Sequence, residues 1–60
     1  MSFIIIRRWT EDREPCWELI DEIDSPGSYE PTVEKWKDRN ATELRRFPDT
    51  RFQLYRLFEP

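Results

Sequence analysis

The first segment of the chain, FIIIRRW, is apolar on both of its sides. Successive side chains of a β-strand point to opposite faces of a sheet. A strand with one solvent-exposed face therefore alternates apolar and polar residues. Here Phe3 and Ile5 share one side, while Ile4 and Ile6 share the other. The pattern predicts a strand over residues 2–9 that needs a cover on each side.

A second apolar segment follows and fits two templates. As a strand, Trp17, Leu19 and Ile23 share one side. As a helix, Leu19, Ile20 and Ile23 recur at spacings that place them on one stripe. Two strands alone make a sheet too narrow to be stable, whereas three strands and a helix form two packed layers. We therefore predict a strand over residues 16–24, with a helix as the alternative.

Apolar residues recur at helical spacing in the second half of the chain. Val33, Trp36, Leu44 and Phe47 lie close to one side of a helix, with Asn40 filling a gap between them. This spacing predicts an amphipathic helix, over residues 31–47, that packs on a sheet through these apolar side chains.

Residues that favour loops surround this helix. The proline and glycine of SPGSYEP predict a loop over residues 25–30. At the other end, Pro48 disfavours helical geometry in the residue before it. In the middle, Asn40 and Thr42 compete for backbone hydrogen bonds. The helix either runs unbroken or breaks near residues 39–42.

The last segment, RFQLYRLFE, is again apolar on both sides. Phe52 and Leu54 share one side, and Tyr55 and Leu57 share the other. The segment predicts a strand over residues 51–59.

Together these elements predict a single α+β domain over residues 1–60, with element order β-β-α-β. A hairpin makes the first two strands antiparallel, and the helix returns the chain so that the third strand runs parallel to the second. A right-handed crossover then places the third strand beside the first. The result is a three-stranded antiparallel sheet of order 2-1-3, with one amphipathic helix packed on one face and FIIIRRW as the central strand.

One helix covers only one face of such a sheet. Either the side of Phe3, Ile5 and Trp9 or the side of Ile4 and Ile6 is therefore left toward solvent. Exposed apolar patches mark partner surfaces. The alternative is that the SPGSYEP segment folds over the second face and buries it within the chain.

Composition limits the chemistry that the chain can carry. It has a single cysteine, Cys16, and no histidine, so an internal disulfide is excluded and neither a zinc site nor an activated thiol is expected. We predict no enzymatic activity, no catalytic residues, no cofactor and no metal. The apolar run FIII is shorter than a signal-peptide core or a membrane span, so we expect a cytoplasmic protein without a membrane segment.

Charge is distributed unevenly along the chain, whose net charge is −3. Residues 11–34 hold nine acidic side chains and one base, and residues 35–60 hold seven bases and four acids. The acidic side chains of the second strand predict a strip that docks on a basic protein surface or imitates phosphates. The candidate protein-binding residues are Trp9, Glu18, Asp21, Glu22 and Asp24.

Arginines interleaved with aromatic residues form a second candidate surface. Such residues contact phosphates and stack on bases in nucleic-acid readers, whereas pairing with the acidic strand would use them within the fold. The candidate basic residues are Arg7, Arg8, Arg45, Arg46, Arg51 and Arg56.

In layout and size, the β-β-α-β order with an acidic second strand resembles small phage-encoded proteins that bind and inhibit a host enzyme, such as the inhibitor of bacterial RNA polymerase made by T7-like phages. The resemblance implies a binding role and transfers no site residue. We expect a small non-enzymatic protein-interaction module, of phage or prophage type, that inhibits or modulates a bacterial protein through its acidic strand and uncovered apolar face. The alternatives are a nucleic-acid-binding protein and a homo-oligomer, in the simplest case a homodimer.

Overall fold

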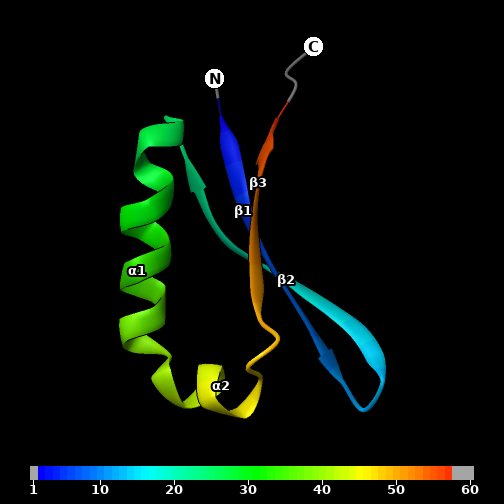
Figure 1. Ribbon diagram of the computed structural model, residues 1–60. Helices are drawn as coiled ribbons and strands as arrows, with labels where there is room; N and C mark the ends of the chain where they lie inside the picture. The colour runs from blue at the N-terminus through cyan, green and yellow to red at the C-terminus, as the bar shows by residue number, and fades with distance from the viewer. Residues whose placement is uncertain (1, 58–60) are drawn as a thin grey trace.

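The computed structural model describes residues 2–57 and has the predicted α+β fold (Figure 1). The sheet has three strands in the order β2-β1-β3, and both neighbouring pairs are antiparallel. The central strand is therefore the first in sequence, as predicted. The elements are β1 (Phe3–Glu11), β2 (Glu14–Ile23), the 3₁₀ turn η1 (Pro26–Ser28), α1 (Tyr29–Arg39), α2 (Ala41–Arg46) and β3 (Arg51–Arg56).

The hairpin between β1 and β2 is longer and tighter than predicted. Glu11 pairs with Glu14, so only Asp12 and Arg13 form the turn. Their φ angles are 51° and 69°, the left-handed values that both central residues of a type I′ turn adopt. Pro15 fits within β2 because that strand lies at the edge of the sheet.

A β-bulge in β2 changes which of its side chains share a face. Ile5 pairs with Asp21 but Ile6 pairs with Leu19, so Ile20 is the inserted residue. An inserted residue shifts the alternation of every side chain beyond it by one. The prediction that Ile23 shares a face with Trp17 and Leu19 is therefore wrong. Ile23 instead lies opposite Phe3, in the core.

The unbroken helix predicted over residues 31–47 is wrong, and the alternative of a break near residues 39–42 is confirmed. Asn40 leaves helical geometry, with φ −124° and ψ 36°. Its Nδ2 donates a hydrogen bond of 2.8 Å to the carbonyl oxygen of Trp36. This is the competition between an Asn side chain and the helical backbone that the sequence indicates. The chain then returns to helical geometry in α2, which ends before Phe47 and Pro48.

The ends of the last two elements also differ from prediction. Residues 26–28 form η1, in which Ser25 Oγ accepts a hydrogen bond of 3.2 Å from the Gly27 amide, and α1 begins directly after it. The strand predicted over residues 51–59 ends at Arg56, although the Leu57 amide still donates to the Ser2 carbonyl at 2.9 Å. Positions 58 and 59 lie outside the described residues.

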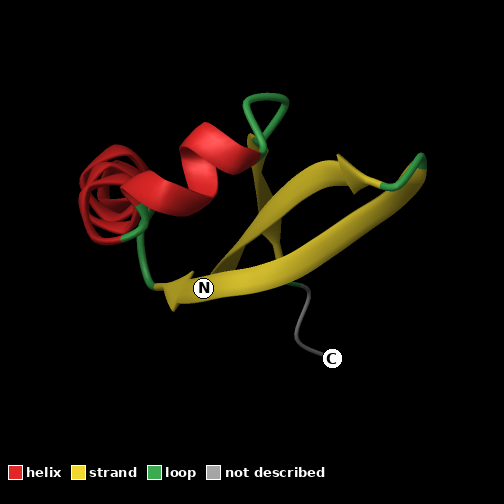
Figure 2. Cartoon of the chain, turned by 90° about the horizontal axis from the view of Figure 1, so that it is seen from below, coloured by secondary structure: helices red, strands yellow, loops and turns green. Residues whose placement is uncertain are grey.

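Both helices lie on the same side of the sheet (Figure 2). The core between them and the sheet is formed by Ile5, Ile23 and Val33, and Ile5 is fully buried. Tyr29, near the end of the SPGSYEP segment, packs against this core rather than on the opposite face. No helix among the described residues is long and apolar enough to cross a membrane. Phe3, Ile20, Tyr29, Phe52 and Leu54 complete the core.

Candidate functional site

The face of the sheet turned away from the helices is called the open face below. Residues that pair across antiparallel strands project on the same side. Ile4 pairs with Glu22 and Tyr55, Ile6 with Leu19 and Gln53, and Arg8 with Trp17 and Arg51. The open face therefore consists of Ile4, Ile6, Arg8, Trp17, Leu19, Glu22, Arg51, Gln53 and Tyr55, with Leu57 following β3.

Large apolar side chains of the open face are exposed to solvent. Trp17 is 65% exposed, Leu19 56%, Tyr55 38% and Leu57 36%. Trp17 and Tyr55 flank Ile6, which is itself buried. A shallow cavity of about 300 Å³ lies among them, lined by Ile4, Ile6, Arg8, Trp17 and Tyr55. A partner could insert an apolar side chain at this point.

Two arginines lie side by side at one end of the open face. Arg8 is held in place, because its Nε donates to Gln53 Oε1 at 2.6 Å and its terminal nitrogen donates to the Tyr55 hydroxyl at 2.9 Å. Arg51 lies directly opposite Arg8 in the sheet. Like charges at such positions repel each other, so this end of the open face favours an anionic group from a partner.

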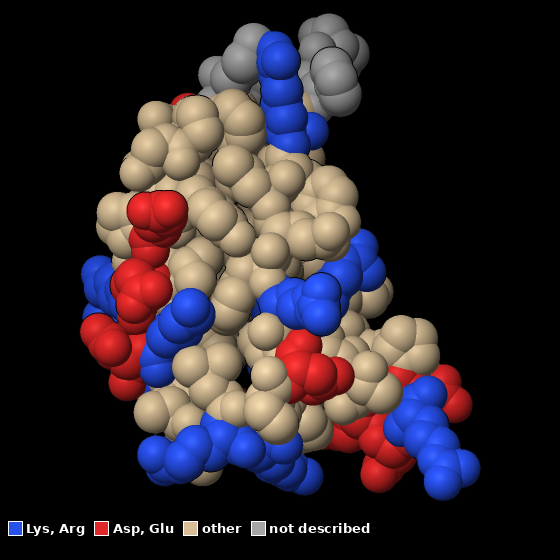
Figure 3. Space-filling model, viewed as in Figure 1, with Lys and Arg blue, Asp and Glu red and all other residues tan. Residues whose placement is uncertain are grey.

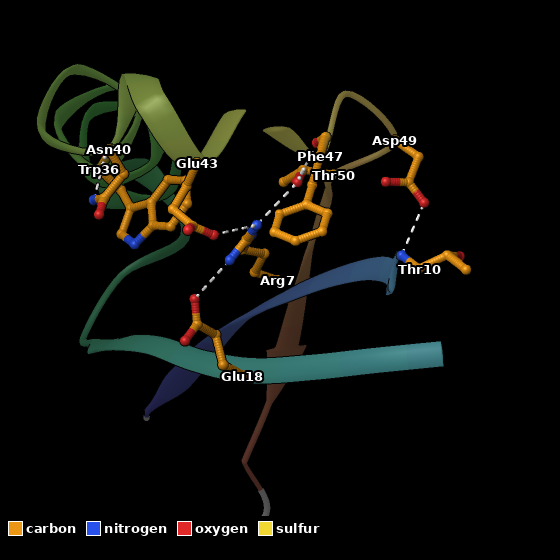
Figure 4. Close-up of polar contacts among 9 residues, drawn as sticks. All are labelled: Arg7, Thr10, Glu18, Trp36, Asn40, Glu43, Phe47, Asp49 and Thr50. Carbon is orange, nitrogen blue, oxygen red and sulfur yellow. Dashed lines mark hydrogen bonds and ion pairs between the residues drawn. The ribbon is translucent and has the colours of Figure 1, made fainter. Parts of the chain in front are cut away.

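The covered face holds a buried charge, Arg7, which is 2% exposed. Figure 4 shows its polar contacts. One terminal nitrogen of its guanidinium lies 3.1 Å from Glu18 Oε1 on β2, and the other lies 3.5 Å from Glu43 Oε2 on α2. The second nitrogen also donates to Thr50 Oγ1 at 3.3 Å, just before β3. Arg7 thus ties the central strand to β2, to α2 and to the segment that enters β3.

Aromatic rings enclose the same guanidinium. Its central carbon lies 4.0 Å from the centre of the Trp9 ring, 4.9 Å from that of Trp36 and 5.9 Å from that of Phe47. Cation–π attraction strengthens when the cation is removed from water. Arg7 Nε and Trp9 Nε1 are buried without an acceptor in the described part of the chain. With two carboxylates already beside Arg7, we assign the cluster to stability rather than to anion binding.

The predicted acidic residues do not form one strip. Glu18 lies on the covered face and pairs with Arg7, whereas Glu22 lies on the open face opposite Ile4. Asp21 lies at the bulge and accepts a hydrogen bond of 2.8 Å from the amide of the next residue. Asp24 is exposed beyond the end of β2. Only Glu22 of this group belongs to the open face.

The predicted basic residues are likewise dispersed. Arg7 is buried and is therefore not a surface residue. Arg45 and Arg46 are in the last turn of α2, and Arg56 lies at the end of β3 opposite Phe3. Of the candidates on different elements, only Arg8 and Arg51 are paired with each other.

Trp9, the aromatic member of the predicted protein-binding set, lies on the covered side. It is half-buried, and its ring centre lies 6.1 Å from that of Phe47. The sequence leaves open which side of β1 is covered, and Trp17, Leu19 and Tyr55 are not among the predicted site residues. A signal for them was present, since the apolar alternation of β2 changes phase between Leu19 and Ile20.

Side chains that could bind a metal ion do not converge in the described part of the chain. Within residues 2–57, no three His, Cys, Asp or Glu side chains are placed to hold a metal ion. Cys16 is partly exposed, and its sulfur lies 3.6 Å from the carbonyl oxygen of Glu14. Comparison of the chain with protein families, with curated proteins and with solved structures finds no match. The geometry of the surface is therefore the basis for inferring a function.

Proposed function

We propose that this protein is a non-enzymatic interaction module that docks a partner protein on its open face. The observation that carries the proposal is the exposure of large apolar side chains on that face, above all Trp17 and Leu19. Burying apolar surface stabilises a complex by about 25 cal/mol per Å² removed from water. A folded protein leaves such side chains clustered and exposed mainly where another molecule binds.

The residue types of the open face support a protein partner in particular. Trp, Tyr and Arg are the side chains that most often dominate the binding free energy of protein interfaces. Trp17, Tyr55 and Arg8 all line the shallow cavity at the centre of this face. Arg8 is already oriented by its hydrogen bonds to Gln53 and Tyr55, so less conformational entropy is lost on binding.

In this proposal the protein acts in the cytoplasm as a phage or prophage product that inhibits or modulates a bacterial protein. The support for that setting is the likeness of layout to small phage-encoded inhibitors. Nucleic acid is the weaker alternative, because the chain is acidic overall and the six candidate arginines do not form one surface. A homodimer through the open face is compatible with the same geometry.

Photo-crosslinking tests the proposal directly. A photoreactive amino acid is placed at Leu19, on the open face, and in a control protein at Lys35, an exposed position on α1. In a bacterial lysate we expect one dominant protein adduct from position 19 and none of that mass from position 35. The adduct should disappear when Ile4→Lys adds a charge to the same face.

Equal adducts from both positions, or an adduct that survives Ile4→Lys, would contradict the proposal. An adduct of the chain with itself, together with sedimentation as a dimer, would identify the homodimer. Binding to DNA or RNA that weakens steeply with salt would favour the nucleic-acid alternative.

A further inference from the structure

The outer edge of β3 offers unpaired backbone groups. Within residues 2–57, β3 pairs only with β1. The Leu57 amide donates a hydrogen bond of 2.9 Å to the Ser2 carbonyl. This bond shows which residues of β3 form hydrogen-bonded pairs with β1. Hydrogen-bonded and non-hydrogen-bonded pairs alternate along antiparallel strands. Gln53 and Tyr55 therefore direct their amide and carbonyl groups toward β1, while Phe52 and Leu54 direct theirs outward.

A groove lies beside the part of this edge where β3 begins. Its volume is about 1090 Å³. One wall is formed by α1 and α2. The other is formed by the segment that enters β3 and by the first two residues of β3. Figure 3 shows an uncharged area on this side of the molecule, with acidic and basic side chains along its α1 margin. The lining residues are Tyr29, Glu30, Val33, Glu34, Lys37, Leu44, Pro48, Thr50, Arg51 and Phe52.

An additional strand along β3 would place alternate side chains on the groove side. Residues of the added strand that lie opposite Phe52 and Leu54 would project on the same side as these two core residues, toward the helices. The apolar part of that side includes Val33 and Leu44, and its rim carries charged side chains such as Glu34 and Lys37. The intervening residues would project on the open-face side, where Arg51 lies beside the like charge of Arg8. The edge thus suits a strand that alternates apolar and acidic residues.

The two edges of the sheet differ in how well they are protected against such pairing. The outer strand β2 contains Pro15, a bulge at Ile20 and several carboxylates, all of which discourage pairing at an edge. The strand β3, RFQLYR, contains no proline and no acidic residue, and its pairing with β1 has no bulge. Pairing with another chain is therefore favoured at β3.

We propose that the edge of β3 binds an extended polypeptide segment as an added antiparallel strand. Apolar side chains of that segment enter the groove, and carboxylates between them face Arg51. The main-chain hydrogen bonds come from Phe52 and Leu54, as in other proteins that recognise peptides by adding a strand to a sheet. Of the open face only Arg51 contributes, and the backbone contacts and the groove lie outside that face, so the inference goes beyond the proposed function and does not depend on it.

The experiment uses a short peptide of alternating valine and glutamate, blocked at both ends, and follows amide hydrogen exchange of the intact protein by NMR. We expect the Phe52 and Leu54 amides to exchange rapidly in the free protein and to become protected when the peptide binds. The Gln53 and Tyr55 amides should be protected with or without peptide. Chemical shifts of Leu19, on the open face, should not change.

Methylated peptides separate strand addition from other modes of binding. Valines opposite Phe52 and Leu54 direct their amides toward β3, and the glutamates direct theirs away. N-methylation of the valines should weaken binding by at least about tenfold, the effect of losing a hydrogen bond together with the added steric clash. N-methylation of the glutamates should leave the affinity unchanged. A valine–lysine peptide should bind several-fold more weakly because it meets Arg51 with a like charge.

Several results would overturn the inference. These are equal affinity of the two methylated peptides, no protection of Phe52 and Leu54 at millimolar peptide, and shifts confined to the open face. Protection of these two amides that rises with protein concentration in the absence of peptide would show a second copy at the edge instead. Equal binding of the lysine peptide would remove the acidic requirement.

Discussion

The two faces of the sheet use the same strand in opposite ways. On the covered face, β1 contributes Ile5, which is fully buried, and Arg7, which is buried with carboxylate and aromatic partners. On the open face it contributes Ile4 and Ile6 between exposed large side chains such as Trp17. A residue's apolar character therefore does not reveal its role here. The helices that return the chain to β3 decide which face provides stability and which is left for recognition.

The contrast extends to charge. The covered face contains a cation whose partners come from two other elements of the same chain. The open face brings Arg8 and Arg51 together, and neither forms an ion pair within residues 2–57. Matched substitutions on the two faces can separate these roles.

The largest difference is expected between neighbouring isoleucines of β1. Ile5→Lys places an unpaired charge in the core and should destabilise the fold by more than about 4 kcal/mol, a large part of what so small a domain possesses. Ile4→Lys projects on the open face opposite Glu22 and should keep the fold. Circular dichroism and urea unfolding measure both. If the two variants unfolded alike, both faces would be internally covered.

A smaller difference is expected between two tryptophans. Trp36 lies edge-on to Phe52, with ring centres 5.5 Å apart, and near Arg7. Trp36→Ala should cost about 3 kcal/mol in free energy of unfolding. Trp17→Ala, on the open face, should change it by less than about 0.5 kcal/mol while weakening partner binding. A shared denaturation midpoint for the two variants would place Trp36 outside the packed interior.

The smallest difference is expected between two glutamates of β2. Glu18→Gln keeps the shape of the side chain but removes one carboxylate from Arg7, while Glu43 remains as its other partner. We expect a loss of about 1 kcal/mol, because the buried cation is then less fully compensated. Glu22→Gln, on the open face, should have almost no effect on stability. Urea unfolding would contradict this comparison if Glu22→Gln were the more destabilising variant.

Much of the fold follows from the pattern of apolar positions together with simple rules of connection. The order β2-β1-β3 could be predicted from three considerations. These are the apolar character of both sides of FIIIRRW, the need for a third strand and the right-handed crossover. The break at Asn40 could be anticipated because its side chain competes for the helical backbone, although a continuous helix was the first prediction. Such features depend on neighbouring residues and short connections.

The candidate site was less predictable because it depends on contacts between distant segments. The bulge at Ile20 determines that Trp17 and Leu19 point away from Ile23, and a one-residue insertion of this kind leaves only a phase change in the sequence. The burial of Arg7 requires Glu18, Glu43 and three aromatic rings to meet. An arginine is therefore not always a surface residue, because a fold that supplies carboxylates and aromatic rings, as around Arg7, can bury it.

The long stretch of chain between the central strand and its partner β3 has a consequence for biosynthesis. Phe3 pairs with Ile23 but also with Arg56, so the β3 side of β1 has no native partner until nearly all of the described chain has been made. At about 5–20 residues per second, the interval between the two partners is on the order of seconds. During that time an isoleucine-rich strand presents an open edge, which invites pairing with other nascent chains. Conditions that slow translation should therefore increase the fraction of chains lost to aggregation.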